Sequence, residues 1–210
     1  MTKSRSIEAL PIDSTKLCCN FVNTVYTWKG DDNYDFLEDY NTFIDWCMKL
    51  AVFDNITLEK LRELSKKVPE EAARTIGRMR GIRKLLHDFI AATARNEPEK
   101  AAGFLEQINA LITEALSHTA LVRGAGTYVL SYRNKEDNLI SPMWTVLKSL
   151  YDLLTLDDLA RVKECPACGW VFYDETKNGK RRWCNPLNCG TKDKMDRYLK
   201  GLREKKGKLY

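Results

Sequence analysis

Four cysteines near the C-terminus occur as two close pairs. Cys165 and Cys168 are separated by two residues, and fifteen residues that begin with Gly169 lead to the second pair, Cys184 and Cys189. Thiolates at this spacing are the donors that a structural Zn²⁺ ion prefers, and four of them complete its tetrahedral shell. A glycine directly after the first pair suits the tight turn that such a site needs. The sequence therefore predicts a zinc site with these four cysteines as ligands.

A redox-active pair is the main alternative for a Cys-x-x-Cys motif. The second cysteine pair and the absence of a thioredoxin-like βαβ pattern favour the metal site. The other cysteines, Cys18, Cys19 and Cys47, lie in apolar stretches with helical spacing. The first residues carry no signal-peptide pattern and no apolar run reaches about 18 residues, so we expect a cytoplasmic protein without membrane contact. Thiols stay reduced there, which also argues against disulfides.

The elements around the cysteines are predicted to form a small finger. Residues 170–173 and 180–183 have strand-like patterns, and the Asn-Gly sequence at 178–179 is typical of a hairpin tip. Residues 192–205 have the composition of a helix. The order of knuckle, hairpin, second cysteine pair and helix predicts a treble-clef-like fold. Because about 45 residues bury little apolar surface, the metal would supply much of the folding free energy.

Charge is distributed unevenly along the chain. Residues 161–210 hold 14 basic and 6 acidic residues, a net charge of +8, whereas residues 1–160 carry −3. Such asymmetry is typical of a segment that binds a polyanion, although a solvated Lys-rich end is an alternative. The basic residues that we predict to contact DNA are Lys180, Arg181, Arg182, Lys192, Lys194 and Arg197. A finger that staples the chain or docks a protein partner is the alternative function.

The rest of the chain has mainly helical periodicity. Apolar residues recur at helical spacing over residues 14–25, 35–50, 57–64, 69–90, 104–116 and 141–154. The period changes to that of a short β-hairpin at 121–123 and 128–132. The 69–90 segment also shows a basic face, formed by Arg74, Arg78, Arg80, Arg83 and Lys84. We predict a mainly α fold with two domains: an α-helical regulatory domain, residues 1–160, and the zinc finger, residues 161–210.

Few residues of the helical part indicate chemistry. Its two histidines, His87 and His118, have no partner at metal or triad spacing, and no phosphate-binding glycine loop is present. We therefore do not expect an enzyme. Asn20, Asn23 and Trp28 lie among apolar residues and could line an effector pocket. Caps or hydrogen bonds between helices are the alternative role for the two asparagines.

The finger resembles the CGNR zinc-finger family of stress-induced bacterial transcription regulators. The resemblance rests on residues 165–174, on Asn178, on residues 181–184 and on residues 188–190. The tetrapeptide that names the family reads Cys-Gly-Thr-Lys here, so Lys192 replaces an arginine and a bidentate guanidinium contact is lost. Residues 21–24, 35–46 and 80–86 are similar to the family's helical first domain. The resemblance implies bound zinc and a DNA-binding regulatory role. We predict a transcriptional regulator that binds DNA through the finger, with the helical body, residues 1–160, dimerising or sensing an effector.

Overall fold

The computed structural model describes residues 6–30, 34–195 and 197–199. Its α-helices are α1 (Leu17–Val22), α2 (Tyr40–Lys49), α3 (Asn55–Lys67), α4 (Pro69–Ala94), α5 (Pro98–Ala102), α6 (Leu105–Ser117) and α7 (Ser141–Leu156). Strands β1 (Thr119–Arg123) and β2 (Tyr128–Tyr132) form one antiparallel pair, and β3 (Val162–Glu164) and β4 (Val171–Tyr173) form another. The helical periods and the β1–β2 hairpin expected from the sequence are confirmed, as is the mainly α fold class.

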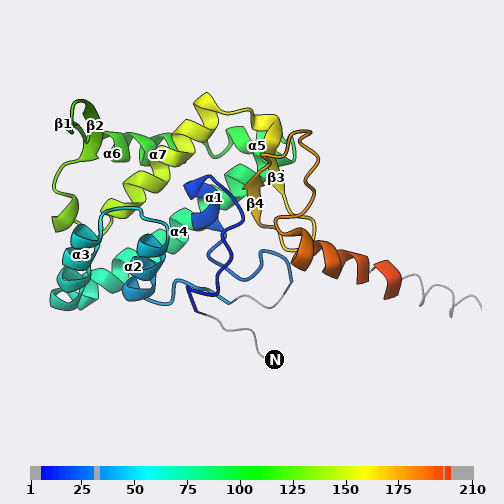
Figure 1. Cartoon of the computed structure of the whole chain (residues 1–210), viewed down its shortest axis with the longest axis horizontal. Coiled ribbons are helices and arrows are strands. Elements are labelled where there is room, and N and C mark those ends of the chain that lie inside the picture. Colours follow the sequence, from blue (N-terminus) through cyan, green and yellow to red (C-terminus); the bar gives the residue numbers. More distant parts are fainter. Residues whose placement is uncertain (1–5, 31–33, 196, 200–210) are drawn as a thin grey trace, which may run out of the picture.

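Helix α4 organises the molecule. Its start is stabilised by Pro69 at the first turn and by Glu70 and Glu71, whose charges complement the helix dipole. Helices α1, α2 and α3 pack against it, and so do β3 and β4. In Figure 1 the β1–β2 hairpin and the finger strands β3 and β4 lie at opposite ends of the molecule. One long helix thus links the body to the finger.

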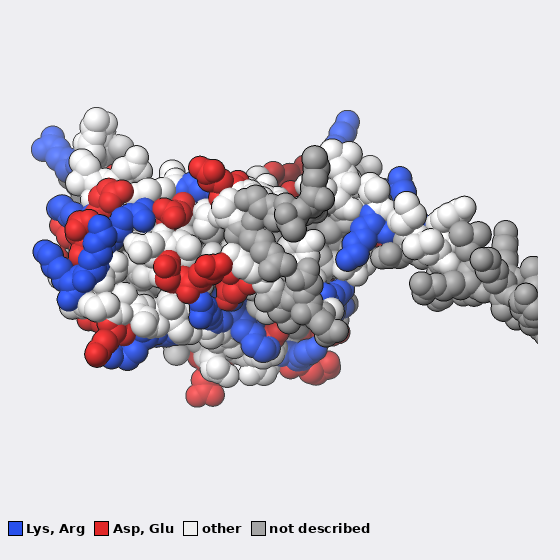
Figure 2. Space-filling view, turned by 90° about the horizontal axis from the view of Figure 1, so that it is seen from below, with Lys and Arg blue, Asp and Glu red and all other residues white. Residues whose placement is uncertain are grey.

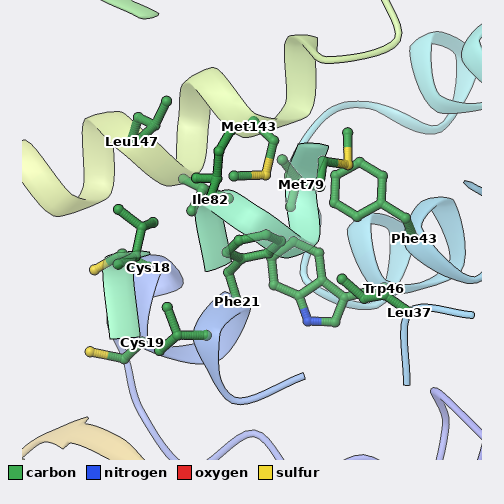
Figure 3. Packing of buried hydrophobic residues seen from close by; sticks show 14 of the residues in the cluster. Cys18, Cys19, Phe21, Leu37, Phe43, Trp46, Met79, Ile82, Met143 and Leu147 are labelled. Atoms are coloured by element: carbon green, nitrogen blue, oxygen red, sulfur yellow. The ribbon is translucent and has the colours of Figure 1, made fainter. Parts of the chain in front are cut away.

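Aromatic side chains from α1 and α2 form the centre of the core. Phe21 meets the ring of Trp46 edge-on at 5.7 Å between centroids, and Phe43 stacks on Trp46 at 6.0 Å. Met79 and Ile82 of α4 cover this group from one side (Figure 3). These buried rings tie the two N-terminal helices to α4.

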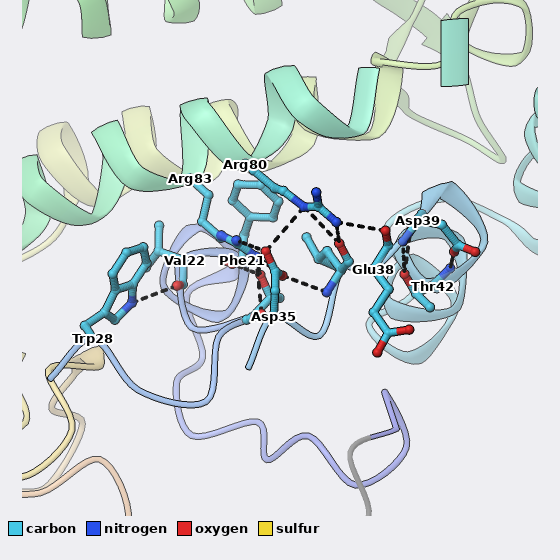
Figure 4. A network of polar contacts seen from close by, with 11 residues as sticks. Phe21, Val22, Trp28, Asp35, Glu38, Asp39, Thr42, Arg80 and Arg83 are labelled. Carbon is cyan, nitrogen blue, oxygen red and sulfur yellow. Dashed lines mark hydrogen bonds and ion pairs between the residues drawn. The ribbon is translucent and has the colours of Figure 1, made fainter. Parts of the chain in front are cut away.

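A buried ion pair fastens the loop after α1 to α4. The guanidinium of Arg83 is only 5% exposed and donates to the carboxylate of Asp35 at 2.7 Å and to the Thr24 hydroxyl at 2.9 Å (Figure 4). Arg80, one turn earlier, donates to the carbonyl of Leu37. Within the basic face of the 69–90 segment, Arg83 is therefore buried and paired. Sequence periodicity places Arg83 beside the core, and Asp35 offsets the cost of burying its charge.

The finger strands pair differently from the prediction. Strand β4 pairs with β3, in the register Val162 to Tyr173, and the segment 180–183 forms no strand. The fully buried carboxylate of Asp174 explains the difference, because it accepts from the backbone N–H of Thr176 at 2.9 Å and of Arg181 at 2.8 Å. These bonds turn the chain away after β4. The first cysteine pair consequently lies in the turn of the β3–β4 hairpin.

The hydrophobic cluster continues from the body into the finger. Val162, Trp170 and Phe172 belong to the same cluster as the buried residues of α1 and α4. The division into residues 1–160 and 161–210 stays a prediction, and the packing across it is continuous. Among the residues that the structure describes, no helix combines the length and the hydropathy that a membrane span requires.

Candidate metal centre

The four C-terminal cysteines come together in space. Their sulfur atoms all lie within 4.8 Å of one another, with 3.5 Å between Sγ of Cys168 and Cys184 and 3.6 Å between Cys184 and Cys189. A tetrahedral ion with Zn–S bonds of about 2.3 Å has sulfur–sulfur edges of about 3.8 Å. All four are free thiols. The donor set and its dimensions therefore fit a single Zn²⁺ ion.

A tight turn places the first pair of cysteines. The N–H of Cys165 donates to the carbonyl of Trp170 at 2.7 Å, and the N–H of Gly169 donates back to the Cys165 carbonyl at 2.9 Å. Gly169 has φ of +77°, a conformation that residues with a Cβ rarely adopt. This turn directs both sulfurs to the same side of the β3–β4 hairpin.

The second pair lies where the chain enters its last helix. The side chain of Asn185 accepts from the N–H groups of Leu187 and Asn188, both at 3.1 Å, and caps a single helical turn at Pro186–Gly190. Residues 191–195 and 197–199 continue as helix, and the remainder of the predicted helix lies outside the described residues. The cap fixes the direction in which this helix leaves the finger.

Without an ion the thiols of the cluster compete for protons. Hydrogen bonds from the neighbouring thiols, foremost Cys168, lower the pKa of Cys165, whereas hydrogen bonds with Cys165 raise the pKa of Cys168 and Cys184. Four thiolates around one dication carry a net charge of about −2. Two cations lie close by: Nζ of Lys29 is 3.3 Å from the Pro166 carbonyl, and the Arg181 guanidinium donates to the Cys184 carbonyl. These two cations offset the charge of the loaded site.

Residues of the body form hydrogen bonds with backbone carbonyls of the knuckle, the turn at residues 165–169. The carbonyl of Cys168 accepts from the Trp28 N–H at 2.7 Å and from the Thr27 hydroxyl at 3.1 Å. The Gly169 carbonyl lies 2.9 Å from Nε2 of His87, which belongs to α4. The turn that carries two ligands is therefore held from outside the finger, by residues more than 80 positions away in the sequence.

The three residues predicted to line an effector pocket have partners inside the protein. Asn20 donates to the Ser14 carbonyl at 2.8 Å, and Asn23 binds the backbone of Val171. Trp28 stacks on His87 at 4.0 Å between ring centroids, and its Nε1–H donates to Val22 at 3.0 Å. Their effector role stays a prediction. These contacts place all three residues where different segments of the chain pack together.

The residues predicted to contact DNA differ in their exposure and in their partners. Lys180, Arg182, Lys192 and Lys194 are exposed, and none has an acidic partner among the described residues. Arg197 is also exposed and pairs with Asp193 at 2.9 Å. Figure 2 shows basic side chains around the base of the C-terminal helix, whereas both signs are mixed on the body. An exposed cationic surface thus adjoins the cysteine cluster.

Arg181 differs from its neighbours. Its guanidinium donates to the carbonyls of Asp13 at 2.9 Å and Trp183 at 3.0 Å, and it lies 4.5 Å from the centre of the Phe172 ring. These contacts hold the N-terminal segment, the finger and the second cysteine pair together. Nothing in the local sequence distinguishes Arg181 from Arg182, so sequence reasoning could not separate their roles.

Several residues that support the site were not found by sequence reasoning. Glu164, beside the first ligand, pairs with Lys29 at 3.0 Å and with Arg95 at the end of α4. Thr27 and His87 bind the knuckle carbonyls, as described above. Their partners are distant in the sequence, so a local pattern contains no signal for them.

The fold and the cysteine cluster define a class: a helical body joined to a four-cysteine zinc finger. Residues 15–157, about two thirds of the chain, match the ABATE family model, whose description is "Putative stress-induced transcription regulator". The chain belongs to this family. Residues 161–200 match the model of the CGNR zinc finger, which together with the sulfur cluster identifies Zn²⁺ as the cofactor. A search of curated proteins finds no significant match.

Proposed function

We propose that this protein is a zinc-dependent transcriptional regulator that binds DNA through its C-terminal finger. Cys165, Cys168, Cys184 and Cys189 hold the ion as thiolates. The family of the chain and the geometry of its sulfurs support this assignment. The ion is structural, because four protein ligands fill its tetrahedral shell and leave no position for a reacting molecule.

The observation that carries the DNA assignment is the group of unpaired cations on the finger. Lys180 and Arg182 precede the third cysteine, and Lys192 and Lys194 occupy the first turn after the fourth, all of them exposed. Cations without acidic partners are free to replace the counterions of DNA phosphates, which drives binding. The helix that begins at residue 191 projects from the molecule (Figure 1). No other part of the described structure therefore blocks its approach to a DNA groove.

Arg181 has a structural role in this proposal. Its guanidinium is occupied by backbone carbonyls and by the Phe172 ring, so it has few donors left for a phosphate. Arg197 is available only when its pair with Asp193 opens. The proposed DNA-binding surface therefore consists of Lys180, Arg182, Lys192 and Lys194, with Arg197 at its margin.

Fluorescence anisotropy with a labelled duplex tests the proposal. Replacing Lys192 and Lys194 together by Ala should weaken binding at least tenfold and reduce the slope of log K against log salt by about two. A matched control replaces Lys66 and Lys67, exposed residues at the end of α3, and should bind like the wild type. Zinc content should be unchanged in both. Equal affinity of the two double variants would refute the proposed surface.

We further propose that the body forms a homodimer through the β1–β2 hairpin. Leu121 and Tyr128 are 74% and 70% exposed, and β2 carries no charged residue. A two-stranded sheet with free edges is only marginally stable by itself, and an uncharged strand can pair with its own copy. Sedimentation equilibrium should show a dimer that Leu121→Glu dissociates, whereas Ile56→Glu, at an exposed site of α3, should leave it intact. A monomeric wild type would refute this second proposal.

A further inference from the structure

A cleft lies at the seam between the helical body and the finger. Its walls come from Lys29 in the loop after α1, from Arg95 at the end of α4, from Lys163 of β3 and from residues 179–182. Its volume is 520 Å³, within the range of sites that bind small molecules or parts of larger ligands. The cleft is separate from the cysteine cluster, although both use the β3–β4 hairpin.

The lining of this seam cleft is strongly basic. Among the described residues that line it, six are basic and one, Glu164, is acidic. The Glu164 carboxylate is shared by Lys29 and Arg95, so those two charges are partly neutralised. Three of the cations lining the cleft keep their charge without an acidic partner in the described structure: Lys163, Lys180 and Arg182.

The arrangement of these three cations selects the class of ligand. Cations that surround a concave surface concentrate positive potential there and attract anions. Lys163 approaches from a strand of the hairpin, whereas Lys180 and Arg182 approach from the loop before the third cysteine. A phosphate group offers several acceptor oxygens in different directions, so it can serve donors that come from separate elements. A carboxylate, with two oxygens in one plane, serves fewer of them.

We propose that the seam cleft binds a phosphate group, and that its source is the backbone of DNA. The inference rests on the proposed function, because the cleft shares Lys180 and Arg182 with the proposed DNA-binding surface. Lys163 extends that surface along β3 toward Lys29 and Arg95, which line the cleft from the body. A DNA strand held there contacts both parts of the chain, and this fixes how the body lies relative to the duplex.

The test compares single charge removals in the zinc-loaded full chain. Lys163→Ala removes a cation that has no acidic partner among the described residues, and the control Lys67→Ala removes an exposed cation at the end of α3, far from the finger. The Lys163 variant should bind a duplex about three- to tenfold more weakly near physiological salt, with a salt slope lower by about one. Lys163→Arg should bind like the wild type, and so should Lys67→Ala.

The outcomes separate the cleft from the finger. If Lys163→Ala binds like Lys67→Ala while the Lys192/Lys194 double variant loses binding, the cleft proposal is wrong and the proposed function stands. If the wild type binds no duplex, the proposed function fails, and titration of ¹⁵N-labelled protein with inorganic phosphate tests whether the cleft binds phosphate at all. Changes in the amide chemical shifts of Lys163 and Gly179 that disappear in Lys163→Ala would then assign the cleft to free phosphate. The absence of such changes would overturn the cleft proposal.

Discussion

The side-chain amide of Asn23 exchanges two hydrogen bonds with the backbone of Val171. Its Nδ2 donates to the Val171 carbonyl at 2.8 Å, and its Oδ1 accepts from the Val171 N–H at 3.1 Å. Asn23 ends α1 and is 2% exposed, and Val171 begins β4, so the amide takes the place of a neighbouring strand. Because both groups are buried, this contact couples the finger to the body.

Replacing Asn23 by Asp tests this coupling. Aspartate keeps the shape of the side chain but turns the donor toward Val171 into a second acceptor, which repels the carbonyl. The free energy of unfolding should fall by about 2–3 kcal/mol, since a buried donor–acceptor pair is left unsatisfied. Urea denaturation measures the change. Asn109→Asp, at an exposed site of α6, should be nearly neutral, and an equally stable Asn23 variant would contradict the coupling.

Substitutions at two glycines with positive φ distinguish the stability cost of backbone strain from that of steric crowding. A Cβ at Gly169 would lie 2.8 Å from Cβ of Trp28, whereas at Gly179 it would meet no atom within 4 Å. Both residues are left-handed, at +77° and +60°. Gly179→Ala should cost about 1 kcal/mol from strain alone, and Gly169→Ala clearly more, since Trp28 must move. Thermal unfolding compares them. Equal losses would mean that the knuckle does not pack on Trp28.

Removal of zinc should destabilise the body as well as the finger. Trp170 is 5% exposed and Phe172 is fully buried in the cluster that continues into the body, so loss of the finger uncovers apolar surface there. A chelator should lower the thermal midpoint and shift tryptophan emission to longer wavelength. Zn²⁺ should reverse both changes, and Mg²⁺ should not, because thiolates are soft ligands. An unchanged midpoint would contradict the continuous packing.

The acid stability of α3 depends on its N-cap. Asp54 accepts from the backbone N–H of Thr57 at 2.9 Å and from its hydroxyl at 2.8 Å, and these bonds, with Lys135 nearby, lower the pKa of Asp54 to about 2. The unfolded value is about 3.9, so the folded state gains stability that is complete above pH 4 and lost toward pH 2.

The corresponding variant is Asp54→Ala. It should cost about 1 kcal/mol at pH 6, the usual value of such a cap. The difference from the wild type should shrink as the pH falls from 5 to 3, as followed by urea titrations monitored through helix ellipticity. Asp54→Asn keeps the cap without the charge and serves as control. A difference that grew at low pH would contradict the sign of the linkage.

Sequence reasoning succeeds here where the signal is local. The period of apolar residues predicts the helices, and the spacing of four cysteines predicts the cluster. It fails where the determining contact is distant. Residues 162–164 form too short a strand to be recognised, and Asp174, which redirects the chain, resembles an ordinary turn residue. Likewise, Asn23 shows no local sign of its partner 148 positions away.

The role of charged residues is equally hard to predict from sequence. Arg83 and Arg181 look like surface cations, because a charge is usually solvated. In the structure Arg83 is buried against Asp35, and Arg181 binds the Asp13 carbonyl. A tertiary partner decides each case. Lys180 and Arg182 look the same in the sequence, yet they remain free to meet a ligand.

Selection from a random pool of DNA duplexes by the zinc-loaded protein, near physiological salt, tests directly whether the finger binds a specific DNA sequence. A defined motif should be enriched, and the enrichment should be lost when Lys192 and Lys194 are replaced by Ala or when the zinc is removed. A palindromic motif would also agree with a dimer. A pool that shows no enrichment would contradict sequence-specific DNA binding and would favour a finger that only joins protein surfaces.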